Sequence, residues 1–108
     1  MLNDRLFLPS APLEWQFQRE VVRFAEEHGW LVHYSIAAHR RGMLRTQQGG
    51  ANGFPDLVLA RDGVVLLAEL KVGRRRLTGG QREWAAAGGA SAVVWRPADA
   101  AEIEEVLR

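Results

Sequence analysis

The chain has 108 residues, of which 47% are apolar, and it contains no cysteine. This length predicts a single domain over residues 1–108, and the composition favours a packed core rather than disorder. The lack of cysteine excludes disulfides, thiolate metal ligands and a cysteine nucleophile. Neither a signal peptide nor a membrane-spanning run is visible, so we expect a cytoplasmic protein without a membrane partner.

The net charge of +1 hides an uneven distribution along the chain. Nine cationic and only three acidic side chains lie between positions 37 and 82, whereas the rest of the chain is net acidic. A basic centre in a nearly neutral protein indicates a local anionic partner such as nucleic acid. A solvated arginine-rich loop is the alternative.

The first half of the chain predicts a helix, a strand and a long loop. Residues 13–28 carry apolar side chains at helical spacing, and Ser10 or Ala11 can cap the helix. Residues 30–36 have the alternation of a strand. Residues 37–53 show no periodicity. We expect this last segment to be a flexible arm, because long structureless stretches in compact domains are usually functional or mobile.

The middle of the chain predicts a β-hairpin. Strands over 56–61 and 64–71 are joined by Asp62-Gly63, which is a strong signal for a tight hairpin turn. Apolar residues occupy both faces of the second strand. This strand is therefore expected in the middle of a sheet, covered on both sides.

The remaining segment predicts a helix, a strand and a second helix. Thr78 and Gln81 have the spacing of a capping box that opens a short helix. A strand over 91–95 should run parallel to the preceding strand, because crossover connections have that geometry. An amphipathic helix over 97–107 ends the αβββαβα order. Its expected core-facing residues are Ile103, Val106 and Leu107.

Three charged residues form the candidate centre of a catalytic site. Glu69 and Lys71 lie two apart on a strand, so they project from the same face. Hairpin pairing places Asp56 opposite Glu69, and two facing carboxylates repel each other unless a hard cation such as Mg²⁺ or Mn²⁺ lies between them. A metal held by carboxylates acidifies a water and neutralises a phosphate, as phosphodiester hydrolysis requires. Lys71 would orient that water or stabilise the developing negative charge.

These residues resemble the signature of the PD-(D/E)XK nuclease superfamily, and the chain looks most like its small VRR-NUC branch. The matching segments, which span about residues 13–97, are Glu14 with Gln18, Gly53-Phe54-Pro55-Asp56-Leu57-Val58-Leu59, Glu69-Leu70-Lys71 and Leu77-Thr78-Gly79-Gly80-Gln81. The resemblance implies a restriction-endonuclease-like fold of the α/β class, an αβββαβ core with a mixed central sheet flanked by helices. It also implies a homodimer that cuts DNA, at branched structures such as Holliday junctions.

The resemblance further implies roles for individual residues. The implied catalytic set is Asp56, Glu69, Lys71, Gln81 and Glu14. Asp56 and Glu69 would bind Mg²⁺ or Mn²⁺ together with the carbonyl of Leu70, and no organic cofactor is expected. Lys71 would be the catalytic lysine, and Gln81 would lie near the water or the scissile phosphate. Glu14 would complete the carboxylate set through a metal-bound water.

Six arginines are candidate contacts to DNA phosphates. They are Arg40, Arg41 and Arg45 in the long arm, and Arg74, Arg75 and Arg76 just after the second hairpin strand. A cluster directly before a helix N-terminus suits phosphate binding. The tryptophans (Trp15, Trp30, Trp84 and Trp95) are expected in the core or at an interface. The histidines His33 and His39 lack a partner at metal-ligand spacing and are expected in surface or partly buried positions.

Simpler interpretations remain for most of these residues. Asp56, Glu69 and Lys71 could form a structural salt bridge at a sheet end. The capping box alone accounts for Gln81, and Glu14 could be a solvated residue that the helix dipole favours. At the level of function, the alternatives are a DNA-binding module of the same fold that does not cut, or an unrelated α/β adaptor that contacts an acidic protein.

Overall fold

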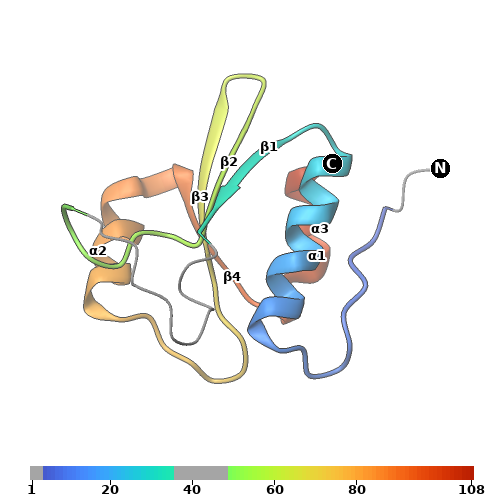
Figure 1. The fold of residues 1–108 in the computed structure, drawn as a ribbon, viewed down its shortest axis with the longest axis horizontal. Coiled ribbons are helices and arrows are strands. Elements are labelled where there is room, and N and C mark those ends of the chain that lie inside the picture. Colours follow the sequence, from blue (N-terminus) through green and yellow to red (C-terminus); the bar gives the residue numbers. More distant parts are fainter. Residues whose placement is uncertain (1–3, 36–48) are drawn as a thin grey trace.

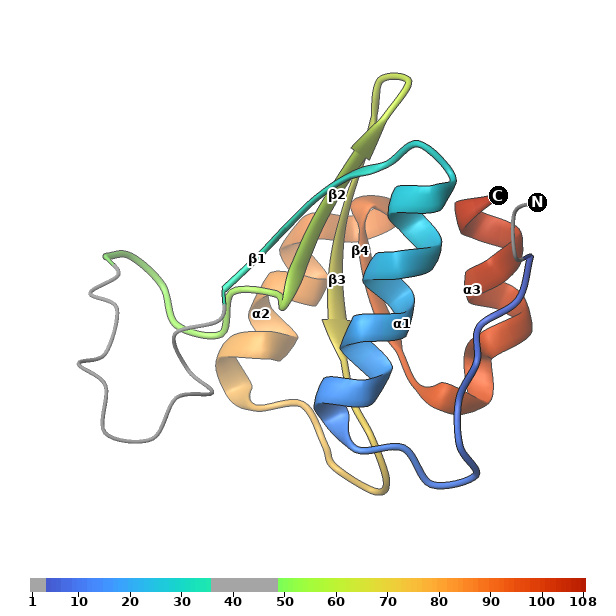
Figure 2. The ribbon, with the colours of Figure 1, turned by 45° about the vertical axis from the view of Figure 1, so that its right-hand side comes forward.

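The described strands form one mixed sheet that lies between two layers of helices. The computed structural model describes residues 4–35 and 49–108, and its strands follow the order β1-β2-β3-β4. The elements are α1 (Glu14–Glu27), β1 (Leu31–Tyr34), β2 (Leu57–Arg61), β3 (Val64–Leu70), α2 (Gly79–Gly88), β4 (Ala92–Trp95) and α3 (Ala100–Leu107). Helices α1 and α3 lie side by side against one face, and α2 lies on the other (Figures 1 and 2). The predicted element order and the mixed sheet flanked by helices are confirmed.

Helix α1 starts later than its predicted cap. The N-cap is Leu13, whose side chain makes no capping hydrogen bond, so the prediction of Ser10 or Ala11 is wrong. Instead, the Leu13 amide donates to Oε1 of Gln16 at 2.9 Å, which satisfies it from within the first turn. The helix ends before Gly29, which adopts a positive φ of 86°.

The hairpin between β2 and β3 has the predicted register. Leu57 pairs with Ala68 and Arg61 with Val64, so paired residue numbers sum to 125 as expected. Asp62 and Gly63 both have positive φ, at 51° and 81°, which is the requirement of a type I′ turn. This tight turn fixes which residues of the two strands face each other.

Only half of β3 is covered on both sides. Leu66, Ala68 and Leu70 are buried towards α1, but Val64 and Val65 near the turn are exposed. The prediction of a fully covered strand is therefore wrong for its first residues. The physical reason is that α2 packs on β4 and the later part of β3 and does not extend over the hairpin tip (Figure 2).

The C-terminal half follows the prediction with two corrections. The Thr78 hydroxyl accepts from the Gln81 amide at the start of α2, and β4 runs parallel to β3. The final helix is divided, because a single 3₁₀ turn over Pro97–Asp99 precedes α3. Val106 is 41% exposed and does not face the core as predicted. It lies off the apolar stripe that Ile103 and Leu107 form at a spacing of one helical turn.

The core fills the space between the sheet and the α1–α3 layer. Its buried apolar residues are Phe17, Val21, Val22, Phe24, Ala25, Trp30, Leu57, Leu59, Leu66, Ala68, Leu70, Trp95, Ile103 and Leu107. Trp30 and Trp95 thus lie in the core, as predicted for tryptophans, whereas Trp15 is exposed. Among the described helices, none has both the length and the apolar character needed to cross a membrane.

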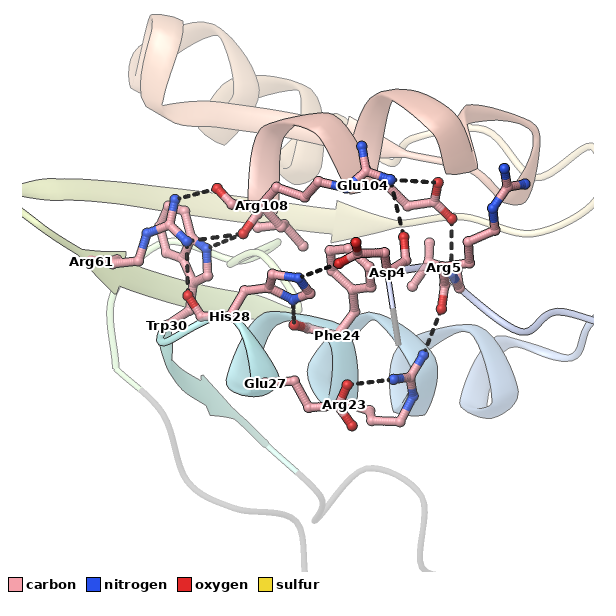
Figure 3. A network of polar contacts seen from close by, with 12 residues as sticks. Asp4, Arg5, Arg23, Phe24, Glu27, His28, Trp30, Arg61, Glu104 and Arg108 are labelled. Atoms are coloured by element: carbon pink, nitrogen blue, oxygen red, sulfur yellow. Dashed lines mark hydrogen bonds and ion pairs between the residues drawn. The ribbon is translucent and has the colours of Figure 1, made fainter. Parts of the chain in front are cut away.

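One end of this core is closed by a cluster around Arg61, the last residue of β2. We call Arg61, Trp30, His28 and the carbonyls of Leu107 and Arg108 the Arg61 cluster (Figure 3). The guanidinium donates to the carbonyls of His28 at 2.8 Å, Leu107 at 3.0 Å and Arg108 at 2.9 Å. It also stacks 4.4 Å from the centre of the Trp30 ring. This single side chain ties together the hairpin, the end of α1 and the end of α3.

Candidate active site

The hairpin brings Asp56 and Glu69 together at the other end of β2. Asp56 directly precedes β2, and continuing the observed register sets it opposite Glu69. Oδ2 of Asp56 accepts a hydrogen bond from the Leu70 amide at 2.8 Å, which orients the carboxylate. Glu69 is only 6% exposed, and no other charged residue in the described part of the chain is buried. A buried carboxyl next to a second acidic group is costly, and such a cost is typical of functional sites.

The surroundings of Glu69 strongly perturb its carboxyl group. Burial raises the pKa of Glu69 to about 8, and the charge of Asp56 and a hydrogen bond with it add to this rise. The positive charge of Lys71 opposes the increase, and the negative charge of Glu14 reinforces it. Ionisation of Glu69 is therefore unfavourable at this site unless a positive charge approaches it.

Lys71 and Gln81 approach the same carboxyl group from two elements. Lys71 follows β3, and the Nζ of its mostly buried side chain lies 3.9 Å from Oε2 of Glu69. Gln81 in α2 donates from Nε2 to this same oxygen at 3.0 Å. Its Oε1 accepts from the Thr78 amide at 2.9 Å, which completes the predicted capping box. The capping role and the contact with Glu69 therefore coexist, and neither excludes the other.

One oxygen of Glu69 remains without a partner. Oε1 is buried, and no hydrogen-bond donor reaches it within the described chain. The described residues do not bring three or more histidine or acidic side chains close enough to bind a metal together. Two adjacent carboxylates still fit Mg²⁺, which is usually held by one or two carboxylates and completes its shell with water and substrate phosphates. The unpartnered Oε1 is the atom that such an ion would satisfy.

Glu14 lies near this pair but has a partner that the sequence did not reveal. Its Oε2 forms an ion pair with Nη1 of Arg75 at 3.1 Å. Arg75 belongs to the loop between β3 and α2, which runs past the first turn of α1 (Figure 2). The ion pair therefore joins Glu14, a predicted catalytic residue, to the arginine loop that is predicted to bind phosphate. No periodicity signals a contact between residues so far apart in sequence.

The basic loop after β3 is shaped by an arginine that the sequence analysis missed. Arg74, Arg75 and Arg76 are exposed. Arg96, directly after β4, donates to the carbonyls of Gly73 at 3.3 Å and Arg75 at 2.6 Å. Since parallel pairing sets the end of β4 beside the end of β3, this contact follows from the sheet topology.

Other predicted site residues lie apart from this constellation or outside the described chain. The side chain of Leu70 is buried in the core, so only its backbone faces the acidic pair. His33 is exposed on β1, as expected of a residue without a metal role. The residues outside the described ranges are His39, Arg40, Arg41 and Arg45, and most of the predicted arm.

A backbone contact fixes the loop before Asp56 against the start of α2. Gly53 has a φ of +84°, and a Cβ added to it would lie 2.5 Å from the amide nitrogen of Gln81. A Cβ added to Gly80 would in turn lie 2.7 Å from the carbonyl oxygen of Asn52. The two segments thus touch through their main chains. This contact holds Asp56 and Gln81 at a fixed separation.

Comparisons with protein-family models, with curated proteins and with solved structures found no match.

Proposed function

We propose that this chain is a metal-dependent DNA endonuclease of the PD-(D/E)XK superfamily, with a restriction-endonuclease-like core. The observation that carries the proposal is the buried Glu69 carboxyl beside Asp56 and Lys71, in which one oxygen has no partner among the described residues. A structural salt bridge would be expected to satisfy its buried oxygens. The pair instead retains capacity for a hard cation.

The residues of the site divide the work of phosphodiester hydrolysis. Asp56 and Glu69 would hold Mg²⁺ or Mn²⁺, together with the predicted Leu70 carbonyl. The bound ion supplies an acidified water and neutralises charge on the phosphate. Lys71 stabilises negative charge as it develops on the phosphate oxygens. Gln81 keeps the Glu69 carboxylate in place through the hydrogen bond at its Oε2.

The exposed arginines next to the site support DNA as the substrate. Arg74, Arg75 and Arg76 follow Lys71 closely in sequence, so a phosphate at the acidic pair would have positive charge beside it. Arg96 holds the loop backbone and limits the entropy lost when DNA binds. Selectivity for branched DNA and function as a homodimer belong to this proposal and rest on the family resemblance alone.

The test is a cleavage assay on linear, flapped, single-stranded and four-way DNA with Mg²⁺, Mn²⁺ or EDTA. The wild-type protein should cut at least one of these DNAs, with metal only. Asp56→Asn and Lys71→Ala should reduce cleavage by roughly 1,000-fold or more while DNA binding persists. The matched control is Asp62→Asn, because Asp62 lies exposed at the hairpin turn and asparagine accepts its positive φ.

Three outcomes would contradict the proposal. Cleavage that continues in EDTA would exclude the metal at the acidic pair. Salt-sensitive DNA binding without cleavage under any metal condition would indicate a binding module of the same fold. The absence of any DNA binding would point to the adaptor alternative.

A further inference from the structure

An exposed aromatic residue lies beside the candidate active site. Phe54 is 46% exposed, although a ring of this size usually avoids water. It lies two residues before Asp56, in the loop whose backbone touches the start of α2. Its ring meets that of Trp84 edge to face, with centroids 5.0 Å apart and an interplanar angle of 89°. The contact with Trp84 orients the Phe54 ring, and the exposed part of this ring remains available to a ligand.

A hollow of about 260 Å³ opens next to this aromatic pair. It is lined by Ala51, Glu83, Trp84 and Ala87, and the lining is mostly apolar. Its volume lies below the roughly 300–1,000 Å³ of pockets for drug-sized ligands, so it suits one small planar ring system. Nε1 of Trp84 is buried and has no acceptor within the described chain. Such an unmet donor is uncommon where packing is purely structural.

The charge around the hollow favours a nucleobase over a phosphate group. Among the described residues that line the hollow, Glu83 is the charged one. A carboxylate repels a phosphate but accepts hydrogen bonds from the N–H groups on the edge of a nucleobase. The sugar–phosphate backbone is thus directed towards the arginine loop after β3, and an uncharged base towards Phe54 and Trp84.

The position of the hollow relates it to the acidic pair. Trp84 follows Gln81 by three residues on α2, an axial rise of about 4.5 Å. Successive nucleotides of one strand are about 3.4 Å apart along a duplex axis and farther apart in an extended strand. A phosphate at Asp56 and Glu69 therefore leaves the base of an adjacent nucleotide within reach of the Phe54 ring.

We propose that Phe54, Trp84 and the adjoining hollow receive an unpaired nucleobase that flanks the scissile phosphate. This inference rests on the proposed function, because it supplies the substrate class of that same site. A paired base cannot enter, since both its faces are stacked in the duplex. The site therefore selects DNA in which the strand is already single or frayed. Stacking on an aromatic ring tolerates any base sequence, and Glu83 favours bases that present an N–H donor.

The experiment measures DNA binding in EDTA, so that cleavage does not interfere. The probes are a flapped duplex with one 2-aminopurine in the single strand near the branch, the same DNA with an abasic site there, and a fully paired duplex. Phe54→Ala should weaken binding of the flapped duplex by about 5- to 150-fold. It should change binding of the abasic flap and of the paired duplex little. Wild-type protein should also change the 2-aminopurine fluorescence, and Phe54→Ala should not.

Matched variants separate stacking from simple burial. Phe54→Tyr keeps the ring and should bind like the wild type, whereas Phe54→Leu keeps apolar bulk and should bind like Phe54→Ala. Equal losses on all three DNAs, or no loss on any, would overturn the base site. A change from dimer to monomer in light scattering with Phe54→Ala would assign the patch to an interface between copies and also overturn it.

The outcomes distinguish this inference from the proposed function. If the flap-specific effect of Phe54→Ala appears in EDTA but no metal supports cleavage, the nuclease activity is wrong and the base site stands. If cleavage is metal-dependent and abolished by Asp56→Asn, but Phe54→Ala binds flapped DNA normally, the active site stands and the base site falls.

Discussion

Two charged clusters occupy opposite ends of β2, and they differ in how completely their polar atoms are satisfied. In the Arg61 cluster, the guanidinium meets three carbonyl oxygens and an aromatic ring (Figure 3). At the Asp56–Glu69 pair, one buried oxygen finds no partner within residues 4–35 and 49–108, and the pKa of Glu69 is raised to about 8. The first arrangement stabilises the fold. The second retains binding capacity at a cost in stability, as expected of a functional site.

The largest difference between the two clusters should appear in catalysis. Glu69→Gln removes one negative charge where the cation is proposed to bind, and it should lower the rate of DNA cleavage by roughly 1,000-fold or more. Arg61→Met should leave the cleavage rate near that of the wild type when it is measured well below the melting temperature. Equal losses in both variants would show that the assay reports folding rather than chemistry.

For the free energy of unfolding, the Arg61 cluster should matter more than the Asp56–Glu69 pair. Arg61→Met leaves several carbonyls without their charged donor, and it should lower the free energy of unfolding by roughly 2–4 kcal/mol. The matched control is Arg19→Met, because Arg19 also lies over a tryptophan, at 5.1 Å from the centroid of Trp15, but on an exposed surface. Its loss should be below about 1 kcal/mol. Urea unfolding of both variants measures the difference. Similar losses in the free energy of unfolding would contradict a structural role of the Arg61 cluster.

The contact between Gly53 and α2 should link stability with activity. Gly53→Ala places a Cβ against the Gln81 amide at a positive φ, and it should cost roughly 1–3 kcal/mol of stability. It should also slow cleavage by roughly 10-fold, since Asp56 and Gln81 would move relative to each other. Gly79→Ala is the control, because its added Cβ meets nothing within 4 Å. A Gly53→Ala protein that is as stable and active as Gly79→Ala would show that the loop adapts without loss.

The smallest effect concerns pH in the absence of metal. Because the pKa of Glu69 is raised to about 8 from 4.5, the folded protein binds more protons than the unfolded chain between these values. The free energy of unfolding, and with it the melting temperature, should therefore fall as pH rises from 4.5 to 8. Glu69→Gln should abolish this slope in EDTA, since glutamine does not titrate. A wild-type profile that is flat or rises over this range would contradict the raised pKa of Glu69.

Features that depend on local geometry could be predicted from the sequence. The Asp62-Gly63 turn fixed the hairpin register and hence the placement of Asp56 opposite Glu69, since a two-residue turn leaves one alignment. The spacing of Thr78 and Gln81 determined the start of α2. These signals succeed because the interacting atoms are only a few residues apart, or are joined by a turn of known shape.

Features that depend on distant contacts could not be predicted. Arg61 ends the predicted strand over 56–61, and only the packing of α3 brings the Leu107 carbonyl to it. The Glu14–Arg75 ion pair joins two surface residues whose approach depends on the path of a loop. Val106 was expected in the core because it is apolar, but the orientation of α3 exposes it. Each of these outcomes follows from how whole elements dock, which periodicity does not specify.

The main-chain contact between Gly53 and Gly80 has an evolutionary consequence. A side chain that clashes with another side chain can be accommodated when the neighbour becomes smaller, but no substitution shortens a backbone. Mutation at either position therefore has no compensating partner, and both should stay glycine for as long as the loop and helix meet in this way. A search for relatives that requires both glycines, an aspartate three residues after the first and a glutamine directly after the second would be far more selective than the short acidic motif alone.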